Sequence, residues 1–218
     1  MDVPIMITRY ETGAPDTPAA LRRCAGAGGE STVALMGDPG ILDRRLLLGF
    51  FCSVRCPGDV VLKTYDLARK LRETDVTVVG GFQSPMEKEC LDVLLRGSAS
   101  IVVCPARGLG RMRIPKGWRD PLAEGRLLIL SFFDDRVRRV TATIAARRNA
   151  RVAALADRIL IAYAEMGGKI EALCKHALAS GKPVFTLESV DNAHLMEPGV
   201  RPVSADNPAC LIADRVDP

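Results

Sequence analysis

An alternation of short apolar segments with longer amphipathic segments runs through most of the chain and constrains its fold more than any other feature. Its clearest instance lies between Arg147 and Leu173. There, apolar positions at helical spacing lead into the run 159–161, which is typical of a buried strand. A loop of small residues ending in Gly167-Gly168-Lys169 follows, and a second helix begins near Ile170. A helix, strand, glycine loop and helix in this order are typical of an open α/β nucleotide-binding sheet.

The same unit recurs along the chain. One helix carries a clear N-terminal signature, because Ser84 can cap it, Pro85 needs no N–H in the first turn, and Glu87 completes a capping box. Strands alternating with helices imply right-handed crossovers. The predicted fold class is therefore α/β, a three-layer, Rossmann-like open and mostly parallel sheet with helices on both faces. The predicted strands are 46–54, 75–79, 100–104, 126–130, 157–162 and 183–187, and the predicted helices are 60–72, 85–97, 139–156 and 169–180.

The two ends of the chain carry weaker patterns. Prolines and glycines interrupt residues 1–44 and leave room only for a short helix at 19–24, so this region is predicted to be an N-terminal arm or lead-in. Residues 45–203 form the predicted Rossmann-like domain, and residues 204–218 form a C-terminal tail. At 218 residues, of which 48% are hydrophobic, the chain is long enough to bury a core of its own.

Cysteine usage and the lengths of the apolar runs limit the cellular setting. The seven cysteines are scattered and odd in number, which suits a reducing compartment better than a disulfide framework. Cys52 and Cys56 could ligate a metal ion, but no second pair or histidine lies at ligand spacing. A packed core thiol and a loop thiol are the favoured interpretation, and no metal is expected. No apolar run is long enough to span a bilayer and the N-terminus lacks an export pattern, so we expect a cytoplasmic protein with no membrane association.

Basic residues are concentrated in one segment. The net charge is +4, yet residues 105–151 contain twelve Lys or Arg against four Asp or Glu, a local excess of +8. Such an excess suits a phosphate-rich partner, and a solvated face is the alternative. Aromatic side chains beside it could stack on bases. The candidate nucleic-acid surface comprises Arg107, Arg111, Arg113, Arg138 and Arg139, with Trp118, Phe132 and Phe133 as candidate stacking residues.

Ligands of parallel α/β sheets bind at the carboxyl ends of the strands. The segments predicted to lie there combine glycines, hydroxyls and basic residues, which suit an anion held at a helix N-terminus. Lys169 opposes the dipole of the helix that it begins, which favours a phosphate ligand over mere solvation. We therefore expect a phosphate or nucleotide pocket made by Ser53, Arg55, Gly80, Gly81, Ser84, Arg148, Asn149, Gly167, Gly168 and Lys169.

A resemblance to a known family rests on two segments. Residues 148–157, RNARVAALAD, followed by an apolar strand, resemble the arginine-asparagine helix motif of the DprA/Smf family of DNA-processing proteins, and residues 49–71 resemble that family's first strand and helix. The resemblance extends to about residue 187. It implies an extended Rossmann fold, binding of single-stranded DNA and loading of a recombinase.

The chain also departs from that family's pattern. Residues 80–84, GGFQS, stand where the family has a serine- and glycine-rich phosphate loop, but the usual Gly-Ile-Asp and Ala-His steps are replaced. No winged-helix tail is expected after Val203. The chain thus resembles a divergent, compact branch of the family.

The central stretch is more distantly similar to the LOG or lysine-decarboxylase-like phosphoribohydrolases. Arg148, Asp157 and Glu171 fall at that family's arginine, aspartate and glutamate steps, and Gly167-Gly168-Lys169 matches its glycine loop in part. This resemblance implies hydrolysis of a nucleoside monophosphate, with Arg148 holding the sugar or phosphate and Glu171 assisting departure of the base.

Two functional hypotheses follow. The first is a protein that binds single-stranded DNA or a phosphate-bearing nucleotide, linked to DNA processing or recombination and without catalysis of its own. The second is a nucleoside-monophosphate hydrolase or a small-nucleotide sensor. Neither requires a cofactor, and a homodimer is compatible with both.

Overall fold

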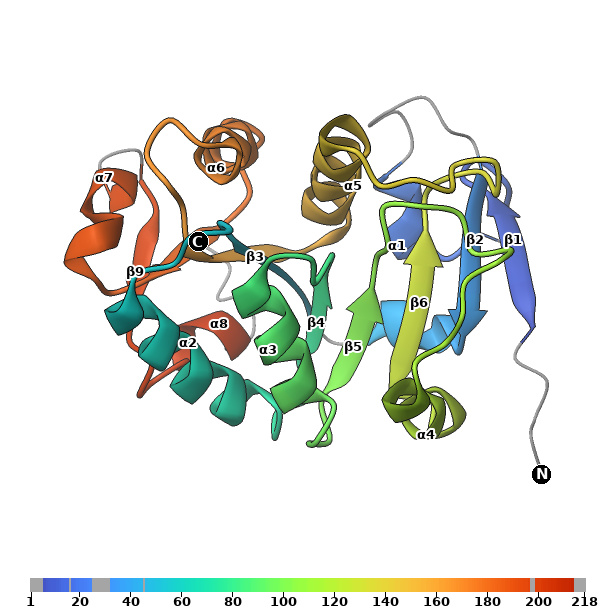
Figure 1. Ribbon diagram of the computed structural model, residues 1–218, viewed down its shortest axis with the longest axis horizontal. Helices are drawn as coiled ribbons and strands as arrows, with labels where there is room; N and C mark the ends of the chain where they lie inside the picture. The colour runs from blue at the N-terminus through green and yellow to red at the C-terminus, as the bar shows by residue number, and fades with distance from the viewer. Residues whose placement is uncertain (1–5, 16, 25–31, 45, 197–198, 214–218) are drawn as a thin grey trace.

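The computed structural model describes residues 6–15, 17–24, 32–44, 46–196 and 199–213, and in them nine strands form one sheet (Figure 1). Its order is β1-β2-β6-β5-β4-β3-β7-β8-β9. Neighbours from β6 to β9 are parallel, whereas β2 is antiparallel to both β1 and β6. The mostly parallel open sheet is therefore confirmed. The strands are β1 (Ile7–Glu11), β2 (Thr32–Gly37), β3 (Leu47–Cys52), β4 (Thr77–Gly80), β5 (Ser100–Val103), β6 (Leu127–Ser131), β7 (Arg158–Tyr163), β8 (Val184–Leu187) and β9 (Arg201–Val203).

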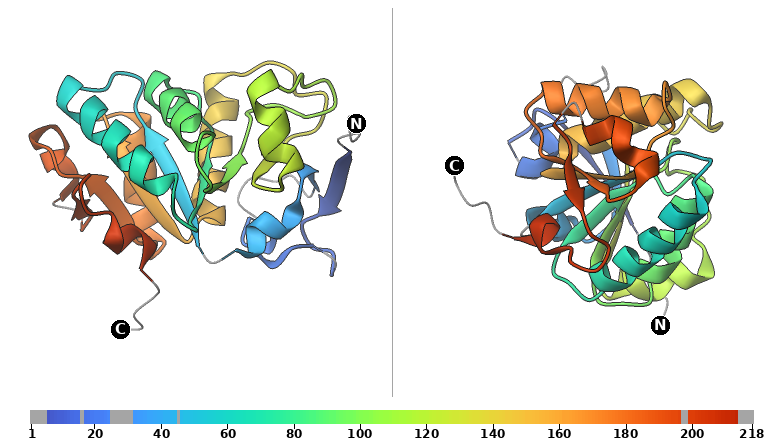
Figure 2. Two further views of the ribbon diagram at one scale, coloured as in Figure 1. Left: turned by 90° about the horizontal axis from the view of Figure 1, so that it is seen from below. Right: turned by 90° about the vertical axis from the view of Figure 1, so that its left-hand side faces the viewer.

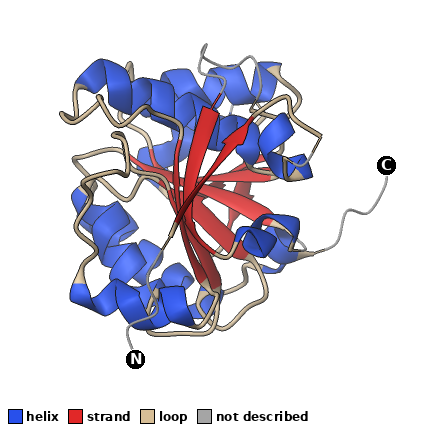
Figure 3. Ribbon diagram, turned by 90° about the vertical axis from the view of Figure 1, so that its right-hand side faces the viewer, coloured by secondary structure: helices blue, strands red, loops and turns tan. Residues whose placement is uncertain are grey.

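Helices cover both faces of this sheet (Figures 2 and 3). The four long ones are α2 (Gly58–Leu71), α3 (Pro85–Leu94), α5 (Ala142–Leu155) and α6 (Lys169–Ala179). Apolar side chains of α2 and α3 pack in one core cluster, and those of α5 and α6 pack in another on the opposite face. Three layers result, as predicted. The shorter elements are α1 (Ala19–Arg22), α4 (Arg119–Ala123), α7 (Ala193–Met196) and α8 (Ala209–Ile212), and the 3₁₀ turns η1 (Pro39–Asp43), η2 (Lys116–Trp118) and η3 (Val190–Asn192).

The central strands are apolar on both faces because helices cover both. All six residues of β3 are buried, with Phe50 in one core cluster and Phe51 in the other. The predicted capping box at the start of α3 is present, since the Ser84 hydroxyl accepts from the Glu87 N–H at 3.3 Å and the Glu87 carboxylate accepts from the Ser84 N–H at 3.2 Å. No helix among the described residues is both long enough and apolar enough to cross a membrane.

The N-terminal region contributes more to the sheet than its sequence indicated. The short helix predicted at 19–24 is present as α1, but the expectation that the region holds nothing else was wrong. β2 pairs with β6 in the register Ala34↔Ser131, and β1 lies beyond β2 at the edge. β2 is a four-residue apolar run flanked by a threonine and a glycine, which is too short to signal a strand by itself.

The order of the strands creates a topological switch beside β3. From β3 the chain adds β4, β5 and β6 on one side, and then α5 carries it back to β7 on the other side. The loops that leave β3 and β7 therefore diverge at their carboxyl ends. Crevices at such points are where open α/β sheets bind ligands.

Candidate functional site

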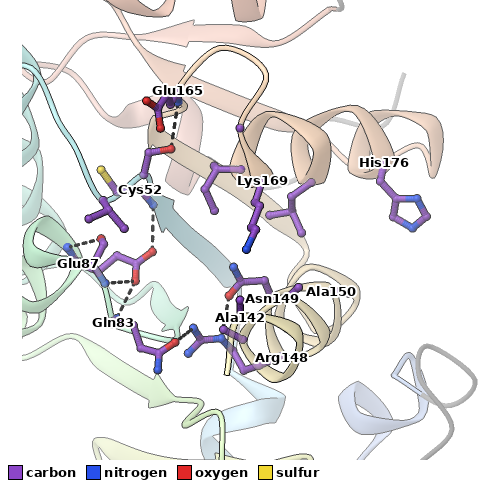
Figure 4. A pocket seen from close by; sticks show the side chains of 18 of the residues that line it. Cys52, Gln83, Glu87, Ala142, Arg148, Asn149, Ala150, Glu165, Lys169 and His176 are labelled. Atoms are coloured by element: carbon purple, nitrogen blue, oxygen red, sulfur yellow. Dashed lines mark hydrogen bonds between the residues drawn. The ribbon is translucent and has the colours of Figure 1, made fainter. Parts of the chain in front are cut away.

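A cavity of about 710 Å³ lies at this switch point, between the loops that follow β3, β4 and β7 (Figure 4). Two of its walls are helices: alanines of α5 face Ile170 and Leu173 of α6. The sequence prediction did not include this apolar wall, although its alanines recur at helical spacing. The lining residues that carry polar side chains are Cys52, Ser53, Gln83, Ser84, Glu87, Arg148, Asn149, Glu165, Lys169 and His176.

The floor of the cavity is organised around a buried carboxylate. Glu87 is 5% exposed, and its carboxylate accepts hydrogen bonds from the backbone N–H groups of Cys52 (3.0 Å), Gln83 (2.8 Å) and Ser84 (3.2 Å). It therefore fastens the end of β3 to the loop after β4. Burial raises the pKa of Glu87, while the three N–H donors and the charge of Arg148 act in the opposite direction.

A buried arginine holds the other side of the cavity. Arg148 on α5 is 2% exposed and donates through Nη1 to the Cys104 carbonyl, through Nη2 to Gln83 Oε1 and through Nε to Asn149 Oδ1, each at 2.7 Å. Burial lowers the pKa of Arg148, and the Glu87 charge opposes that shift. The candidate Arg148 lines the cavity, and each of its three nitrogens donates one hydrogen bond to a neighbouring protein oxygen.

Gly81 makes room for that arginine. A Cβ atom at position 81 would lie 1.5 Å from Arg148 Nη1. The next residue, Phe82, has a positive φ of 49°, which is uncommon for a side chain of this size and marks the loop as held by its surroundings. Gly81, a predicted phosphate contact, does not line the cavity, and its missing side chain leaves the space that the guanidinium occupies.

We expect Gly81→Ala to lower the free energy of unfolding by about 1–3 kcal/mol, because the new methyl group must displace a guanidinium that three hydrogen bonds hold. Gly58→Ala is the matched control, since nothing lies within 4 Å of a Cβ at that position. Urea denaturation of the two variants checks this. Equal midpoints would show that Arg148 moves aside at no cost.

Several unused hydrogen-bonding groups along the cavity are donors. The oxygens of Gln83 and Asn149 accept from the arginine, which leaves their NH₂ groups unused among the described residues. The Ser53 hydroxyl accepts from the Glu165 N–H at 3.0 Å, and the Ser84 hydroxyl accepts from an N–H in the first turn of α3. Each hydroxyl therefore keeps its proton for a ligand. Such a lining suits an acceptor-rich anion. Two carboxylates oppose it: that of Glu165 is exposed, and that of Glu87 is buried and accepts three backbone N–H groups.

Lys169 adds a positive charge to this lining. It is exposed, begins the 11-residue helix α6 and has no hydrogen-bond or ion-pair partner among the residues described. Figure 4 shows its ammonium group and the Asn149 amide nitrogen pointing toward the same part of the cavity. A cation at a helix N-terminus opposes the dipole unless an anion is present, so this end of the cavity favours a negative ligand.

The glycine loop before α6 has its own internal support. Gly167 has a φ of +72°, and its N–H donates to the carboxylate of Glu171. Lys175 pairs with the same carboxylate at 2.6 Å, and these two contacts lower the pKa of Glu171. A Cβ at Gly168 would lie 2.7 Å from the Glu165 carbonyl oxygen. Gly167, Gly168 and Lys169 all line the cavity, whereas Glu171 does not.

Three other candidates from the sequence lie away from the cavity. Arg55 is exposed in the turn after β3, and Gly80 is buried at the end of β4; neither lines the cavity. Asp157 immediately precedes β7, at the amino ends of the strands and so away from the cavity. There it accepts a hydrogen bond from the Leu47 N–H at 2.9 Å and pairs with Arg23. The described residues contain no group of three or more His, Cys, Asp or Glu that could hold a metal ion.

Two loops of the basic segment follow the carboxyl ends of β5 and β6, the same ends of the strands at which the cavity lies (Figure 1). The loops are joined, because the Gly108 N–H donates to the Val137 carbonyl at 2.9 Å and the Gly110 N–H donates to Asp135 at 2.8 Å. Arg9 of β1 also pairs with Asp135 at 2.6 Å. Of the predicted surface residues, Arg107 is half-buried, and the exposed ones are Arg111, Arg113, Arg138 and Arg139.

The proposed aromatic stacking residues do not accompany these arginines. Phe132 is fully buried and Phe133 is 3% exposed, since both belong to the core cluster beneath α5. Trp118 packs against the other core cluster and directly precedes α4, near the amino end of β6. The expectation of base stacking by the two phenylalanines was therefore wrong: the apolar pattern SFF continues the buried strand.

Comparison with known proteins identifies the fold. No protein-family model matches the sequence, and no curated protein matches it. DNA processing protein A (DprA) from Streptococcus pneumoniae is similar in structure, with a TM-score of 0.77 and 16% identity over 97% of this chain and 75% of that one. DNA processing protein A from Helicobacter pylori, which binds single-stranded DNA, has a TM-score of 0.73 and 19% sequence identity over 97% of this chain and 98% of that one. The molybdenum cofactor binding protein from Rippkaea orientalis is less similar, with a TM-score of 0.53 and 12% sequence identity over 78% of this chain and 96% of that one. This chain therefore has the fold of DNA processing protein A and, at lower similarity, that of the molybdenum cofactor binding protein.

Proposed function

We propose that this protein binds single-stranded DNA along the carboxyl edge of its sheet, with a phosphate-bearing nucleotide unit seated in the cavity between α5 and α6, and that it serves DNA processing or recombination. The observation that carries the proposal is the polarity of the cavity. Each serine and amide oxygen of the lining already accepts a hydrogen bond from a protein N–H, and the unused O–H and NH₂ donors of those side chains suit a ligand rich in acceptors.

The surroundings of the cavity support a polymer as the ligand. Arg138 and Arg139 are exposed in the loop that leads into α5, whose residues line the cavity. A nucleotide in the cavity could therefore continue as a chain whose phosphates pass these arginines. The shared fold with DNA processing protein A, including the Helicobacter pylori protein that binds single-stranded DNA, supports the same assignment.

The geometry does not favour the alternative hydrolase. Both oxygens of the Glu171 carboxylate contact the protein, one through the Gly167 N–H and the other through Lys175, and its side chain does not line the cavity. A general acid or base must reach the proton that it transfers. Glu171 is better explained as the group that holds the glycine loop.

Fluorescence anisotropy with a labelled single-stranded oligonucleotide tests the proposal. We expect affinity to fall steeply with salt, and Arg138→Ala/Arg139→Ala to reduce the slope of log K against log salt by about 1.4, since each phosphate contact on a single strand contributes about 0.7. The matched control is Arg69→Ala/Arg96→Ala, which removes the same charge from the exposed carboxyl ends of α2 and α3, at the other edge. Equal slopes in the two double variants would contradict a binding surface on the basic loops.

Lys169→Ala distinguishes the contribution of the cavity to binding from that of the basic loops. We expect it to lower the affinity for the oligonucleotide and for a competing nucleoside monophosphate by a similar factor of about ten, because each ligand loses one charge-assisted hydrogen bond. If the monophosphate competes equally well against wild type and Lys169→Ala, its phosphate binds outside the cavity. Absence of any oligonucleotide binding at low salt would overturn the proposed function.

A further inference from the structure

One acidic side chain lies at the junction of the two basic loops, residues 104–115 after β5 and residues 132–141 after β6, which both extend toward β1 (Figure 1). Asp135 is exposed, yet one oxygen of its carboxylate accepts the Gly110 N–H at 2.8 Å and the other pairs with Arg9 of β1 at 2.6 Å. The Gly110 N–H and the Arg9 guanidinium lower the pKa of Asp135, so this carboxylate is charged at neutral pH. Both of its oxygens are therefore engaged by the protein.

This negative charge stands among the exposed arginines of the proposed DNA surface, which are Arg111, Arg113, Arg138 and Arg139. A carboxylate repels phosphates, and charge alone therefore makes it unfavourable on a surface that binds a polyanion. Its contacts offer a reason for its place there. Asp135 belongs to the loop after β6 and holds a residue of the loop after β5, and so it connects the two sets of arginines.

The two loops approach each other too closely for a side chain at two positions of the first loop. A Cβ atom at Gly108 would lie 2.5 Å from the Cα atom of Asp135, and one at Gly110 would lie 2.5 Å from its Oδ2 atom. A side chain at position 108 meets backbone, which cannot turn aside as a flexible side chain can. The close packing of the loops at Asp135 therefore depends on glycine at position 108.

Two further hydrogen bonds join the same loops. The Gly108 N–H donates to the Val137 carbonyl at 2.9 Å, and the hydroxyl of Ser131, the last residue of β6, donates to the Arg107 carbonyl at 2.7 Å. Ser131 is fully buried. It therefore fixes the start of the first loop to the sheet, whereas Asp135 fixes the part of that loop that directly precedes Arg111.

We propose that Asp135 is a positioning residue that joins the basic loops into one surface, so that arginines of both loops contact the phosphates of the same single strand. This role rests on the proposed function, since it concerns how the DNA-binding surface is built. Through the Gly110 N–H, Asp135 sets the position of the segment that continues into Arg111. Arg9 in turn holds the carboxylate from the edge of the sheet, which gives the N-terminal strand β1 a part in the same surface.

Asp135→Ala tests this role, because charge and positioning predict opposite changes in affinity for a labelled single-stranded oligonucleotide. Loss of a negative charge alone would raise the affinity. We expect the affinity at about 0.1 M salt to fall about fivefold instead, which is what one phosphate contact with a salt slope of about 0.7 contributes over a tenfold range of salt. Asp134→Asn is the matched control, since it removes the same charge from the neighbouring exposed residue and still offers an oxygen to the Arg136 N–H. Its affinity should rise, and a rise in both variants would overturn the proposal.

Gly108→Ala makes the same comparison without changing any charge. Its methyl group meets the backbone of residues 134 and 135 and must push the loops apart, so we expect a similar fall of about fivefold in affinity. Gly117→Ala is the control in the same basic segment, since nothing lies within 4 Å of a Cβ atom there, and it should bind as the wild type does. Wild-type affinity in Gly108→Ala would contradict the proposal.

Hydrogen exchange measures the junction between the loops without any ligand. The bond from the Gly108 N–H to the Val137 carbonyl involves neither the Asp134 nor the Asp135 side chain, so its exchange reports whether the loops separate. We expect the Gly108 N–H to exchange faster in Asp135→Ala than in Asp134→Asn or the wild type. Unchanged exchange would overturn the joining of the loops by Asp135. Faster exchange in a protein that binds no oligonucleotide would instead count against the proposed function.

Discussion

Replacing Arg148 by alanine is expected to lower the free energy of unfolding by about 3 kcal/mol and to weaken oligonucleotide binding at least tenfold. The substitution leaves the buried Cys104 carbonyl without its donor and removes the cation nearest to Glu87. An unsatisfied buried polar group costs about 1–3 kcal/mol, and Glu87 also loses the favourable charge of Arg148. Release of the arginine from its own desolvated position offsets part of this loss.

The effect on binding arises from the two amides that Arg148 orients. Without its Nη2 and Nε donors, the Gln83 and Asn149 side chains can turn their oxygens into the cavity. An amide oxygen facing a phosphate replaces an attraction with a repulsion, so the loss exceeds that of one hydrogen bond. Arg148→Lys keeps the charge but lacks the planar fork, and we expect it to bind nearly as weakly as the alanine variant.

Arg147→Ala is the matched control for both measurements. Arg147 is the neighbouring residue on α5, is exposed and lies over the Phe133 ring at 5.8 Å. Interactions of an exposed arginine are screened by water, and an exposed cation–π contact is worth about 0.5–1 kcal/mol, so removal of Arg147 should leave stability within about 1 kcal/mol of the wild type. Urea denaturation and fluorescence anisotropy on the two variants check the prediction. Similar losses in both would mean that charge on α5, and not the buried network, sustains the site.

The fold was largely predictable because its central strands are buried on both faces. Such strands read as continuous apolar runs, as in Leu47–Cys52, and helices with clear stripes separate them. The edge strands carry no such signal. β1 is ITRYE with a largely exposed pattern, and β9 is only three residues long with a proline at its centre. Their pairing depends on neighbours that are distant in the sequence, so local pattern cannot reveal it.

The sequence predicts which strand ends meet at the cavity, but not how the side chains there contact one another. Strand ends converge in any parallel sheet, which is why the sequence groups Ser53, Ser84 and Gly168, and all three line the cavity. Glu87 was recognised only as a helix cap, because its third contact, the Cys52 N–H, comes from 35 positions earlier. Arg148 is predicted to contact a ligand, and the sequence does not reveal that it also orients Gln83, because the two residues lie 65 positions apart.

Replacing Glu87 by alanine is expected to lower the free energy of unfolding by about 3 kcal/mol, because three backbone N–H groups lose their acceptor in a buried site. Glu87→Gln retains one acceptor oxygen but turns an NH₂ group toward the remaining donors. Its free energy of unfolding should therefore lie between those of the wild type and the alanine variant. Glu89→Ala, two residues further along the same helix, is the control. Its exposed carboxylate accepts from the Tyr65 hydroxyl at 2.5 Å, and its removal should change stability by less than about 1 kcal/mol.

The pH dependence of stability provides a second, independent measure of the same carboxylate. Burial raises the pKa of Glu87 in the folded protein above that of the unfolded chain, about 4.3. Between these two values the folded state binds more protons than the unfolded state, so this group makes stability fall as pH rises through that window. The difference in unfolding free energy between wild type and Glu87→Ala should therefore be largest at the acidic end and shrink toward neutral pH. A difference that grows with pH would mean that the three N–H donors outweigh burial and hold the pKa of Glu87 below its ordinary value.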